Sequence, residues 1–240
     1  MKHQRVVVAI PARDESASIR QCIRSVDQAA AEVPVPVVVV VAADTCSDDT
    51  LDVARATTTE YCEVLVISGE WGRAGAARAA AVRHAFDHLP PDRCPVWIAN
   101  TDADCVVPTM WLRTQLELAT ESDAVAGIVE LDPASTAPAL LDAFAASYPL
   151  GDDNHGHVHG ANIGVCSNAY LAVGGWCAET VVGEDHVLWN AMRDLGHRLR
   201  QTTRLSVQTS ARTRSRVLGG FATNLDHLDS QQSRLLSAHV

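Results

Sequence analysis

The stretch RVVVAIPARDE at residues 5–15 decides the fold that we expect for this chain. Its first part, Arg5 to Ile10, is continuous, apolar and β-branched, which is typical of a strand buried on both faces of a parallel sheet. The sequence then turns polar after Pro11. Because ligands bind at the carboxyl ends of the strands in doubly wound sheets, residues 11–15 mark the expected ligand side of the molecule.

The same alternation of strand and helix patterns continues outward from this stretch. Further strands are expected at Val35–Val41, Glu63–Ile67 and Pro95–Ala99. Helices are predicted after Ser16 or Ser18, from Asp48–Thr50 onward, and from the turn at Gly72–Gly75 to about His88. Such alternation indicates βαβ units, so we predict an α/β fold with a doubly wound, mostly parallel central sheet.

The second half of the chain has a less regular pattern. It predicts helices at 108–120, 136–147 and 183–195, strands at 124–130 and 199–208, and a loop at 151–160 that is rich in histidine and glycine. We find no internal repeat and no linker between independent parts. A single domain over residues 1–240 is therefore expected.

The composition excludes several classes of protein. Hydrophobic residues make up 47% of the chain and charged residues 20%, which excludes disorder, and the net charge of −10 argues against a nucleic-acid surface. No apolar run approaches the roughly 20 residues of a membrane span, and no signal peptide is recognised, so we expect a cytoplasmic location. The seven cysteines show no C-x-x-C spacing and are expected mostly as small buried side chains.

Polar clusters follow each of the first four predicted strands. They are PARDE at 11–15, ADTCSDDT at 43–50, GRAG at 72–75 and NTDAD at 100–104. No G-x-G-x-x-G follows the first strand and no P-loop motif is present, which disfavours dinucleotide cofactors and excludes P-loop chemistry.

Asp102 and Asp104 form the most informative pair. Two carboxylates one residue apart, directly after an apolar strand, can offer hard oxygen ligands to Mg²⁺ or Mn²⁺. Such a cation neutralises a diphosphate leaving group. A solvated D-x-D loop without a ligand is the alternative that the pattern alone leaves open.

Taken together and in order, six segments resemble the family 2 glycosyltransferases of the GT-A fold. They are IPARDE, ADTCSDDT, GRAGAARAAA, NTDADCVVP, HGANIGVCSNAYLAVGGW and GEDHVLW, and the resemblance covers roughly residues 5–200. It implies transfer of a sugar from a UDP- or GDP-sugar donor to an acceptor hydroxyl, with a divalent cation. It also implies a nucleotide-sugar-binding half at 1–105 and an acceptor half at 106–240.

The resemblance assigns the donor side as follows. A cation would be ligated by Asp104, with Asp102 binding the ribose or a metal-bound water. The nucleotide pocket would be lined by Pro11, Ala12, Arg13, Glu15, Asp44, Arg73, Gly75, Arg78 and Ala103. Among these, Glu15 would contact the ribose or base and Asp44 the nucleobase side.

The acceptor side depends on the E-D pair Glu184–Asp185, where the resemblance implies that Asp185 is the general base. The alternative is that these two acids only stabilise the helix N-terminus, where carboxylates are favoured whether or not they take part in catalysis. Sugar or acceptor contacts are implied for His159, Gly160, Asn162, Gly175 and Trp176. Metal binding by His155, His157 and His159 is a second interpretation of that loop.

The tail departs from the pattern of the family. Related enzymes often supply a histidine as a third metal ligand near the equivalent of 210–216, and this chain has none there. Water is the expected substitute. Arg212 and Arg214 could clamp the diphosphate or a phosphorylated acceptor, or could belong to a solvated tail.

Two rival functions are kept. A sugar-phosphate nucleotidyltransferase would usually carry a glycine-rich basic loop after the first strand, where this chain has PARDE. A non-catalytic nucleotide-sugar-binding or scaffold protein is disfavoured by the intact D-A-D and E-D pairs. The expected partners are a nucleotide-sugar donor and a hydroxyl acceptor, and a homodimer is left open.

Overall fold

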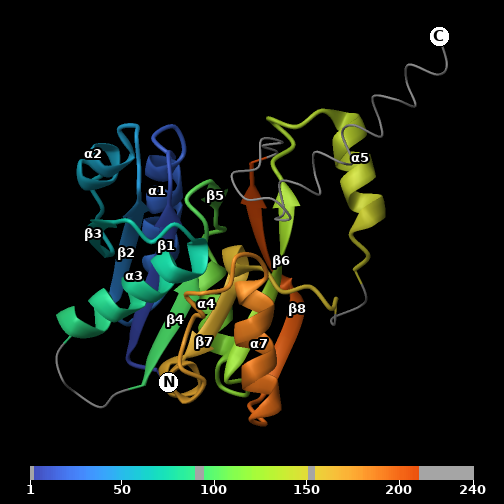
Figure 1. The fold of residues 1–240 in the computed structure, drawn as a ribbon. Coiled ribbons are helices and arrows are strands. Elements are labelled where there is room, and N and C mark those ends of the chain that lie inside the picture. The colour runs from blue at the N-terminus through green and yellow to red at the C-terminus, as the bar shows by residue number, and fades with distance from the viewer. Residues whose placement is uncertain (1–2, 90–94, 151–154, 211–240) are drawn as a thin grey trace.

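The computed structural model describes residues 3–89, 95–150 and 155–210, and its strands form one eight-stranded sheet in the order β3-β2-β1-β4-β7-β6-β8-β5 (Figure 1). The strands are β1 (Arg5–Ala12), β2 (Val37–Asp44), β3 (Glu63–Gly69), β4 (Val96–Asn100), β5 (Cys105–Val106), β6 (Ala124–Leu131), β7 (Ile163–Cys166) and β8 (Leu199–Thr209). The helices are α1 (Ile19–Ala30), α2 (Thr50–Arg55), α3 (Ala74–His88), α4 (Trp111–Leu118), α5 (Pro138–Ser147), the short 3₁₀ helix η1 (Gly160–Asn162), α6 (Ser167–Ala172) and α7 (Glu184–Asp194).

The first four predicted strands pair in parallel, as the sequence predicts. Val8 of β1 lies opposite Val39 on one side and Ala99 on the other. Val6 to Ile10 are fully buried, because neighbouring strands and helices cover both the edges and the faces of β1. The continuous apolar runs of the first half therefore form the centre of the sheet.

Beyond β4 the sheet becomes mixed. β7 runs antiparallel to both β4 and β6, whereas β6 and β8 are parallel to each other and β5 pairs antiparallel with β8. The sequence did not predict β5, β7, η1 or α6. These elements are short, with two to six residues, and a segment of that length shows no hydrophobic period. Their places depend on pairing with distant strands.

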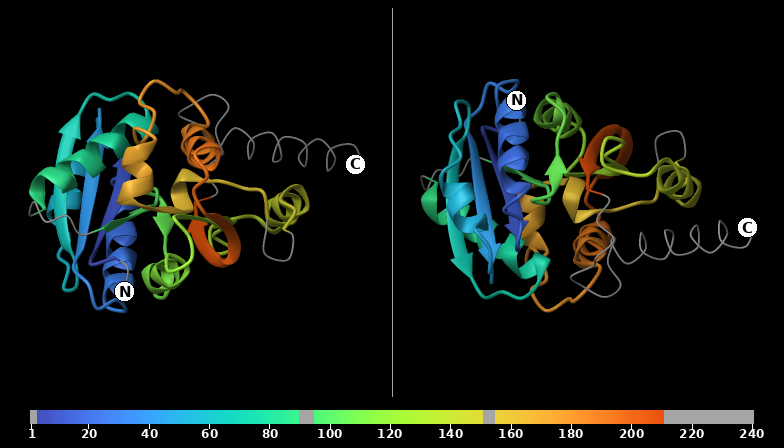
Figure 2. Two further views of the ribbon diagram at one scale, coloured as in Figure 1. Left: turned by 90° about the horizontal axis from the view of Figure 1, so that it is seen from below. Right: turned by 90° about the horizontal axis from the view of Figure 1, so that it is seen from above.

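Helices cover both faces of the sheet. Figure 2 shows α1 and α4 on one face and α3, α6 and α7 on the other, which is the layering of a doubly wound fold. Helix α5 stands out from the body and is anchored by Leu140, which packs on Leu131 of β6 (Figure 1). Within the described part of the chain, no helix combines the length and the apolar composition that a membrane crossing requires.

Gly127 marks an irregularity in the pairing of β6 with β8. The register shifts between Ala126 and Ile128, and a Cβ on Gly127 would lie 2.3 Å from Nδ2 of Asn162 and 2.4 Å from the carbonyl oxygen of Leu205. The Asn162 amide donates hydrogen bonds to the carbonyl oxygens of Ile128 (2.8 Å) and Leu205 (3.1 Å). Glycine is therefore required here to admit this amide.

Asn162 thus has a structural role in place of the sugar contact that we expected. Its side chain is 1% exposed, and its Oδ1 also accepts a hydrogen bond from the indole of Trp111 at 2.9 Å. The amide joins β6, β8 and α4 inside the protein, so it is closed off from a ligand.

We predict that Gly127→Ala lowers the free energy of unfolding by about 2–4 kcal/mol, because the new methyl group overpacks the site and displaces the Asn162 amide. Urea denaturation measures this change. Gly69→Ala is the control, since the three atoms nearest to its Cβ all belong to the side chain of Trp71 and not to backbone or to a buried hydrogen-bonded amide. Equal losses in the two variants would contradict the role given to Asn162.

Candidate active site

Asp44, which the sequence assigns to the nucleotide side, is the last residue of β2. Its side chain is 5% exposed, and its Oδ1 accepts hydrogen bonds from the backbone N–H groups of Trp71 (2.7 Å) and Gly72 (2.9 Å). This carboxylate therefore holds the turn between β3 and α3 against the end of β2. Whatever it contacts in a ligand, it also fixes the shape of the loop that carries Arg73.

The loops after β1 and β2 are bound to each other by acidic side chains. Asp14 accepts hydrogen bonds from the Ser47 backbone (2.6 Å) and hydroxyl (3.0 Å), and Asp48 accepts one from the Ser16 backbone at 3.0 Å. These hydrogen bonds lower the pKa of Asp14. For Asp48, desolvation opposes the shift, yet the hydrogen bonds with Thr50 and Ser16 lower its pKa well below the usual value.

Asp14, Cys46 and Asp48 bring one possible ligand atom each to within 4.8 Å of one another. Such a group could hold a metal ion, although hydrogen bonds already occupy both carboxylates. Glu15 lies beside them: its backbone N–H donates to the Thr50 hydroxyl at 2.6 Å, and its carboxylate accepts a hydrogen bond from the Ser18 hydroxyl at 2.9 Å.

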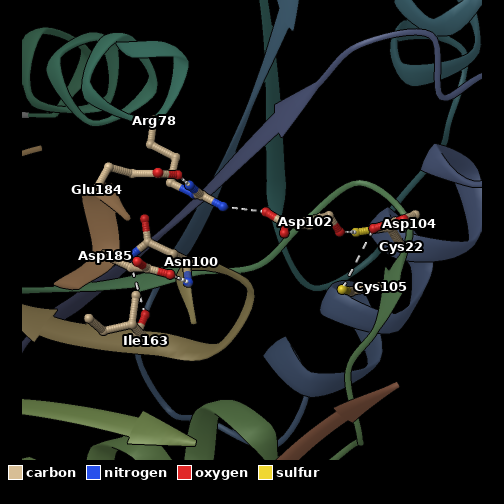
Figure 3. Close-up of polar contacts among 10 residues, drawn as sticks. Cys22, Arg78, Asn100, Asp102, Asp104, Cys105, Ile163, Glu184 and Asp185 are labelled. Carbon is tan, nitrogen blue, oxygen red and sulfur yellow. Dashed lines mark hydrogen bonds and ion pairs between the residues drawn. The ribbon is translucent and has the colours of Figure 1, made fainter. Parts of the chain in front are cut away.

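Arg78 connects the two acidic pairs singled out in the sequence. It lies in α3 with a side chain 3% exposed, and its guanidinium binds Oδ1 of Asp102 and, at 2.8 Å, Oε1 of Glu184. Figure 3 shows the guanidinium reaching from Glu184 on one side to Asp102 on the other. Its planar face lies 5.1 Å from the ring of Trp176. Arg78 is therefore an internal tie, which corrects the expectation that it reaches a diphosphate.

The charges around Arg78 do not balance. Burial opposes its ionisation, but Asp102, Glu184 and Asp185 together raise its pKa. Burial, aided by the like charges of Glu184 and Asp185, raises the pKa of Asp102 against the attraction of Arg78. Two carboxylates thus bind one guanidinium, and the charge of a third, Asp185, acts on it without a direct ion pair. The cluster has an excess of negative charge that a further cation would relieve.

Asp104 extends this acidic cluster on its other side. Its carboxylate accepts a hydrogen bond from the Ser210 hydroxyl at 2.8 Å, and Figure 3 shows it near Cys22 and Cys105, away from Arg78. Ser210 was identified in the sequence only as the start of a segment lacking histidine. The structure places its oxygen beside Asp104, and no sequence signal indicated this contact between residues 106 positions apart.

These residues fit a divalent cation. Asp102 and Asp104 offer hard oxygen ligands after the carboxyl end of β4, and the carboxylates around Arg78 outnumber its single guanidinium. In the described part of the chain, the three possible ligand residues whose atoms already lie within 4.8 Å of one another are Asp14, Cys46 and Asp48.

Asp185 lies in the first turn of α7. Its Oδ2 accepts a hydrogen bond from the backbone N–H of Gly160 at 3.0 Å, and its Oδ1 accepts one from the backbone N–H of His186 at 2.8 Å. A Cβ on Gly160 would lie 2.6 Å from the guanidinium carbon of Arg78. The Gly160 backbone therefore fits between the base candidate and the buried arginine only because it has no side chain.

Arg73, just before α3, and Gly75, in its first turn, contact the chain around the start of α7. Nη1 of Arg73 donates to the carbonyl oxygens of Ala178 (3.3 Å) and Glu179 (2.8 Å). A Cβ on Gly75 would lie 3.0 Å from Cγ of Glu184, so α3 and α7 touch at that point.

Trp176 also differs from expectation, whereas Gly175 forms the expected turn and its contact with a sugar stays a prediction. Gly175 has a φ of +77° and lies against the ring of Tyr170, and Trp176 is 4% exposed beneath Arg78. Because the indole of Trp176 is buried against Arg78, its ring surface is not exposed for stacking on a sugar.

The histidine loop forms a ladder of stacked rings. The ring of His157 lies 3.9 Å from that of Tyr148, 5.7 Å from that of His155 and 5.9 Å from that of His159. Parallel rings do not direct their nitrogens to one point, and the described residues contain no convergent group of these three histidines. The metal interpretation of this loop is therefore wrong. Burial lowers the pKa of His159 to about 4, so this ring is neutral at pH 7.

The other predicted pocket residues lie at the carboxyl ends of β1 and β4. Ala12 and Ala103 are buried at 3% and 2% exposure, Pro11 is half-buried, and Arg13 is exposed. The two alanines can therefore shape the pocket mainly through their backbone. Arg212 and Arg214 lie outside the described residues.

Comparison with protein families gives one match. The model of glycosyl transferase family 2 matches residues 7–157, which include every residue that the sequence assigned to the nucleotide pocket. No curated protein matches the chain.

Solved structures share the fold at low sequence identity. A mannosyltransferase from Pyrobaculum calidifontis in complex with GDP-Man and Mn²⁺ has 18% identity and a TM-score of 0.63, over 90% of this chain and 59% of that chain. S. aureus TarS 1-349 has 13% identity and a TM-score of 0.61, over 87% of this chain and 60% of that chain. A TarS complex with UDP is matched equally well, at 14% identity, a TM-score of 0.61, and 86% and 60% coverage. The chain thus spans about 60% of the length of these structures.

We predict that Arg78→Met lowers the free energy of unfolding by about 3–5 kcal/mol at pH 7.5, because it leaves Asp102 and Glu184 charged and unpaired. A carboxylate with a raised folded pKa contributes its stability below the unfolded value of about 4 and loses it as the pH rises. The loss in the variant is therefore expected to shrink between pH 7.5 and 4.5, as measured by urea denaturation.

The control for this variant is Arg113→Met, which removes an exposed ion pair with Glu117 on α4. A surface pair of this kind contributes at most about 1 kcal/mol. A loss in Arg78→Met that does not change with pH would contradict the charge imbalance described above.

Proposed function

Because this chain belongs to glycosyl transferase family 2, we propose that it is a metal-dependent glycosyltransferase that moves a sugar from a UDP- or GDP-sugar to an acceptor hydroxyl. One observation supports this proposal above the others. Arg78 ties the D-A-D pair at the end of β4 to the E-D pair at the start of α7, and so assembles acidic groups from both halves of the chain at one place.

The donor would lie across the carboxyl ends of β1, β2 and β4. Glu15 and Asp44 would contact the nucleoside, and Asp104 with Asp102 would hold Mg²⁺ or Mn²⁺. When bound, the cation supplies positive charge to the diphosphate leaving group. Support for this arrangement comes from the excess of carboxylates over guanidinium around Arg78. It also fits two fold neighbours, the mannosyltransferase solved with GDP-Man and Mn²⁺ and TarS solved with UDP.

In the chemical step the acceptor oxygen bonds to the anomeric carbon of the donor sugar. The bond between that carbon and the diphosphate oxygen breaks, and its electron pair leaves with the nucleoside diphosphate. Asp185 takes the proton of the acceptor hydroxyl. The free backbone N–H groups at the start of α7 and the N–H of Gly160 stabilise the ionised carboxylate before the proton arrives.

Glu184 has a different part in this proposal. Its carboxylate is bound to Arg78 and only 15% of its side chain is exposed, so it positions the start of α7. The next residue, Asp185, makes no direct ion pair with Arg78 among the described contacts. We therefore propose Asp185, and not Glu184, as the general base.

We predict that Asp104→Asn abolishes the Mn²⁺-dependent increase in melting temperature that UDP or GDP gives to the wild type, and lowers turnover by more than ~10²-fold. Thermal shift with a panel of nucleotide sugars, with and without Mn²⁺, measures the first effect. Asp87→Asn, an exposed change on α3, is the control. Full turnover after EDTA treatment would rule out the metal.

Asp185→Asn is expected to lower kcat by ~10²–10⁴-fold with little change in the apparent affinity for the donor, because the amide accepts a hydrogen bond but not a proton. Steady-state release of nucleoside diphosphate measures both quantities. Asp194→Asn, at the exposed far end of the same helix, serves as the control. Loss of donor affinity in proportion to rate would make Asp185 a sugar-positioning residue, and near-normal turnover would leave it as a helix-capping acid.

A further inference from the structure

The turn between β3 and α3 is held in place at the nucleotide side of the candidate site. This β3–α3 turn, residues 70–73, is bound to Asp44 through the backbone N–H groups of Trp71 and Gly72, at 2.7 and 2.9 Å. Gly72 has a φ of +71°, and the carbonyl oxygen of Arg73 already accepts a backbone hydrogen bond of α3 at 3.0 Å. Because Asp44 fixes one part of the turn and α3 fixes the next, the backbone of Arg73 moves only with both.

The side chain of Arg73 joins this turn to the α7-entry loop, residues 177–183. Its Nη1 donates to the carbonyl oxygens of Ala178 at 3.3 Å and Glu179 at 2.8 Å. Among the described residues, these are the hydrogen bonds that join the loop to a part of the fold other than α7. Packing adds little, since the two adjacent valines of the loop are 59% and 42% exposed. The position of the α7-entry loop therefore depends on Arg73.

A second contact brings the start of α3 against the start of α7 in space. A Cβ on Gly75, in the first turn of α3, would lie 3.0 Å from Cγ of Glu184 and 3.0 Å from the carbonyl oxygen of Cys177. The two helix starts therefore touch. In the same turn of α7, Oδ2 of Asp185 accepts the hydrogen bond from the N–H of Gly160 at 3.0 Å, so a displacement of this helix start changes that hydrogen bond.

We propose that Arg73 is a positioning residue for the general base, and that it links the binding of a nucleoside at Asp44 to the placement of Asp185. This inference rests on the proposed function and changes the part of Arg73 in it, from lining the nucleotide pocket to holding the α7-entry loop. The nucleoside and the N–H groups of the β3–α3 turn share one carboxylate, so binding at Asp44 changes the hydrogen bonds that place the turn. Arg73 passes this change to the loop and to the start of α7, and such coupling between two sites is reciprocal.

The test follows backbone amide signals by NMR while uridine, guanosine, UDP or GDP is titrated in the presence of EDTA. Without a cation, a response near Asp185 does not come from metal binding at the D-A-D pair. In the wild type, at least one of the four compounds should shift the amides of Trp71 and Gly72, which bind Asp44, and also the amide of Gly160, which binds Asp185. In Arg73→Gln the first two shifts should remain and the Gly160 shift should be lost.

Two further variants and one kinetic measurement separate positioning from packing and from donor binding. Arg73→Lys keeps a cation with three N–H donors for the same carbonyl oxygens, so it should restore the Gly160 shift. Arg83→Gln, another arginine of α3 and an exposed one, is the matched control and should respond like the wild type. Arg73→Gln should lower kcat by ~10–10²-fold, the effect of a misplaced base, while the apparent affinity for the nucleotide sugar stays within about twofold.

Several results would overturn the proposal. An undiminished Gly160 shift in Arg73→Gln, or shifts of Trp71 and Gly72 without a Gly160 shift in the wild type, would remove the link between the two sites. Loss of donor affinity in proportion to rate would return Arg73 to the nucleotide pocket. If none of the four compounds shifts Trp71 and Gly72, Asp44 is not a nucleoside contact and the proposal fails. Binding of UDP or GDP with Mn²⁺, measured by thermal shift, still decides on the proposed function, so each idea can fail without the other.

Discussion

The candidate active site of this protein depends on one buried guanidinium. Arg78 in α3 binds Asp102 after β4 and Glu184 at the start of α7, over a ring contact with Trp176. A buried arginine is stable only when carboxylates compensate its charge, and buried carboxylates need the arginine in turn. The two halves of the chain are therefore tied at the place where the donor and acceptor sites are proposed to meet. Gly160 and Gly75 complete this arrangement, since a side chain at either position would crowd the tie.

The excess of carboxylates links this tie to function. An arginine that binds Asp102 and Glu184 and lies within the influence of Asp185 leaves negative charge that folding alone does not neutralise. Such frustration is typical of sites that are completed by a ligand. A divalent cation with a nucleotide would relieve it on the donor side.

Several predicted ligand contacts have structural roles instead, and for one physical reason. Asn162 and Trp176 belong to motifs that resemble those of the family. A sequence motif does not show whether such a residue contacts a ligand or packs inside the protein. In the structure Asn162 uses its amide to join β6, β8 and α4, and Trp176 lies beneath Arg78. Both are buried, and a buried side chain with its hydrogen bonds inside the protein does not meet a sugar. The histidines at 155, 157 and 159 stack instead of converging, because the loop directs alternate rings into one parallel ladder with Tyr148.

The sequence by itself determined the parallel half of the sheet, the helices between its strands, and the positions of the acidic pairs at strand and helix ends. These follow from local hydrophobic period and from the rule that strand ends gather at one edge. Only the tertiary structure decided the antiparallel insertion of β7, the contact of Ser210 with Asp104, and the choice of Arg78 as a buried tie in place of a diphosphate ligand. Each of these depends on residues far apart in the chain. Which of these distant residues meet depends on how charged groups are buried and on how the strands pair across the whole sheet. A local stretch of sequence contains information on neither.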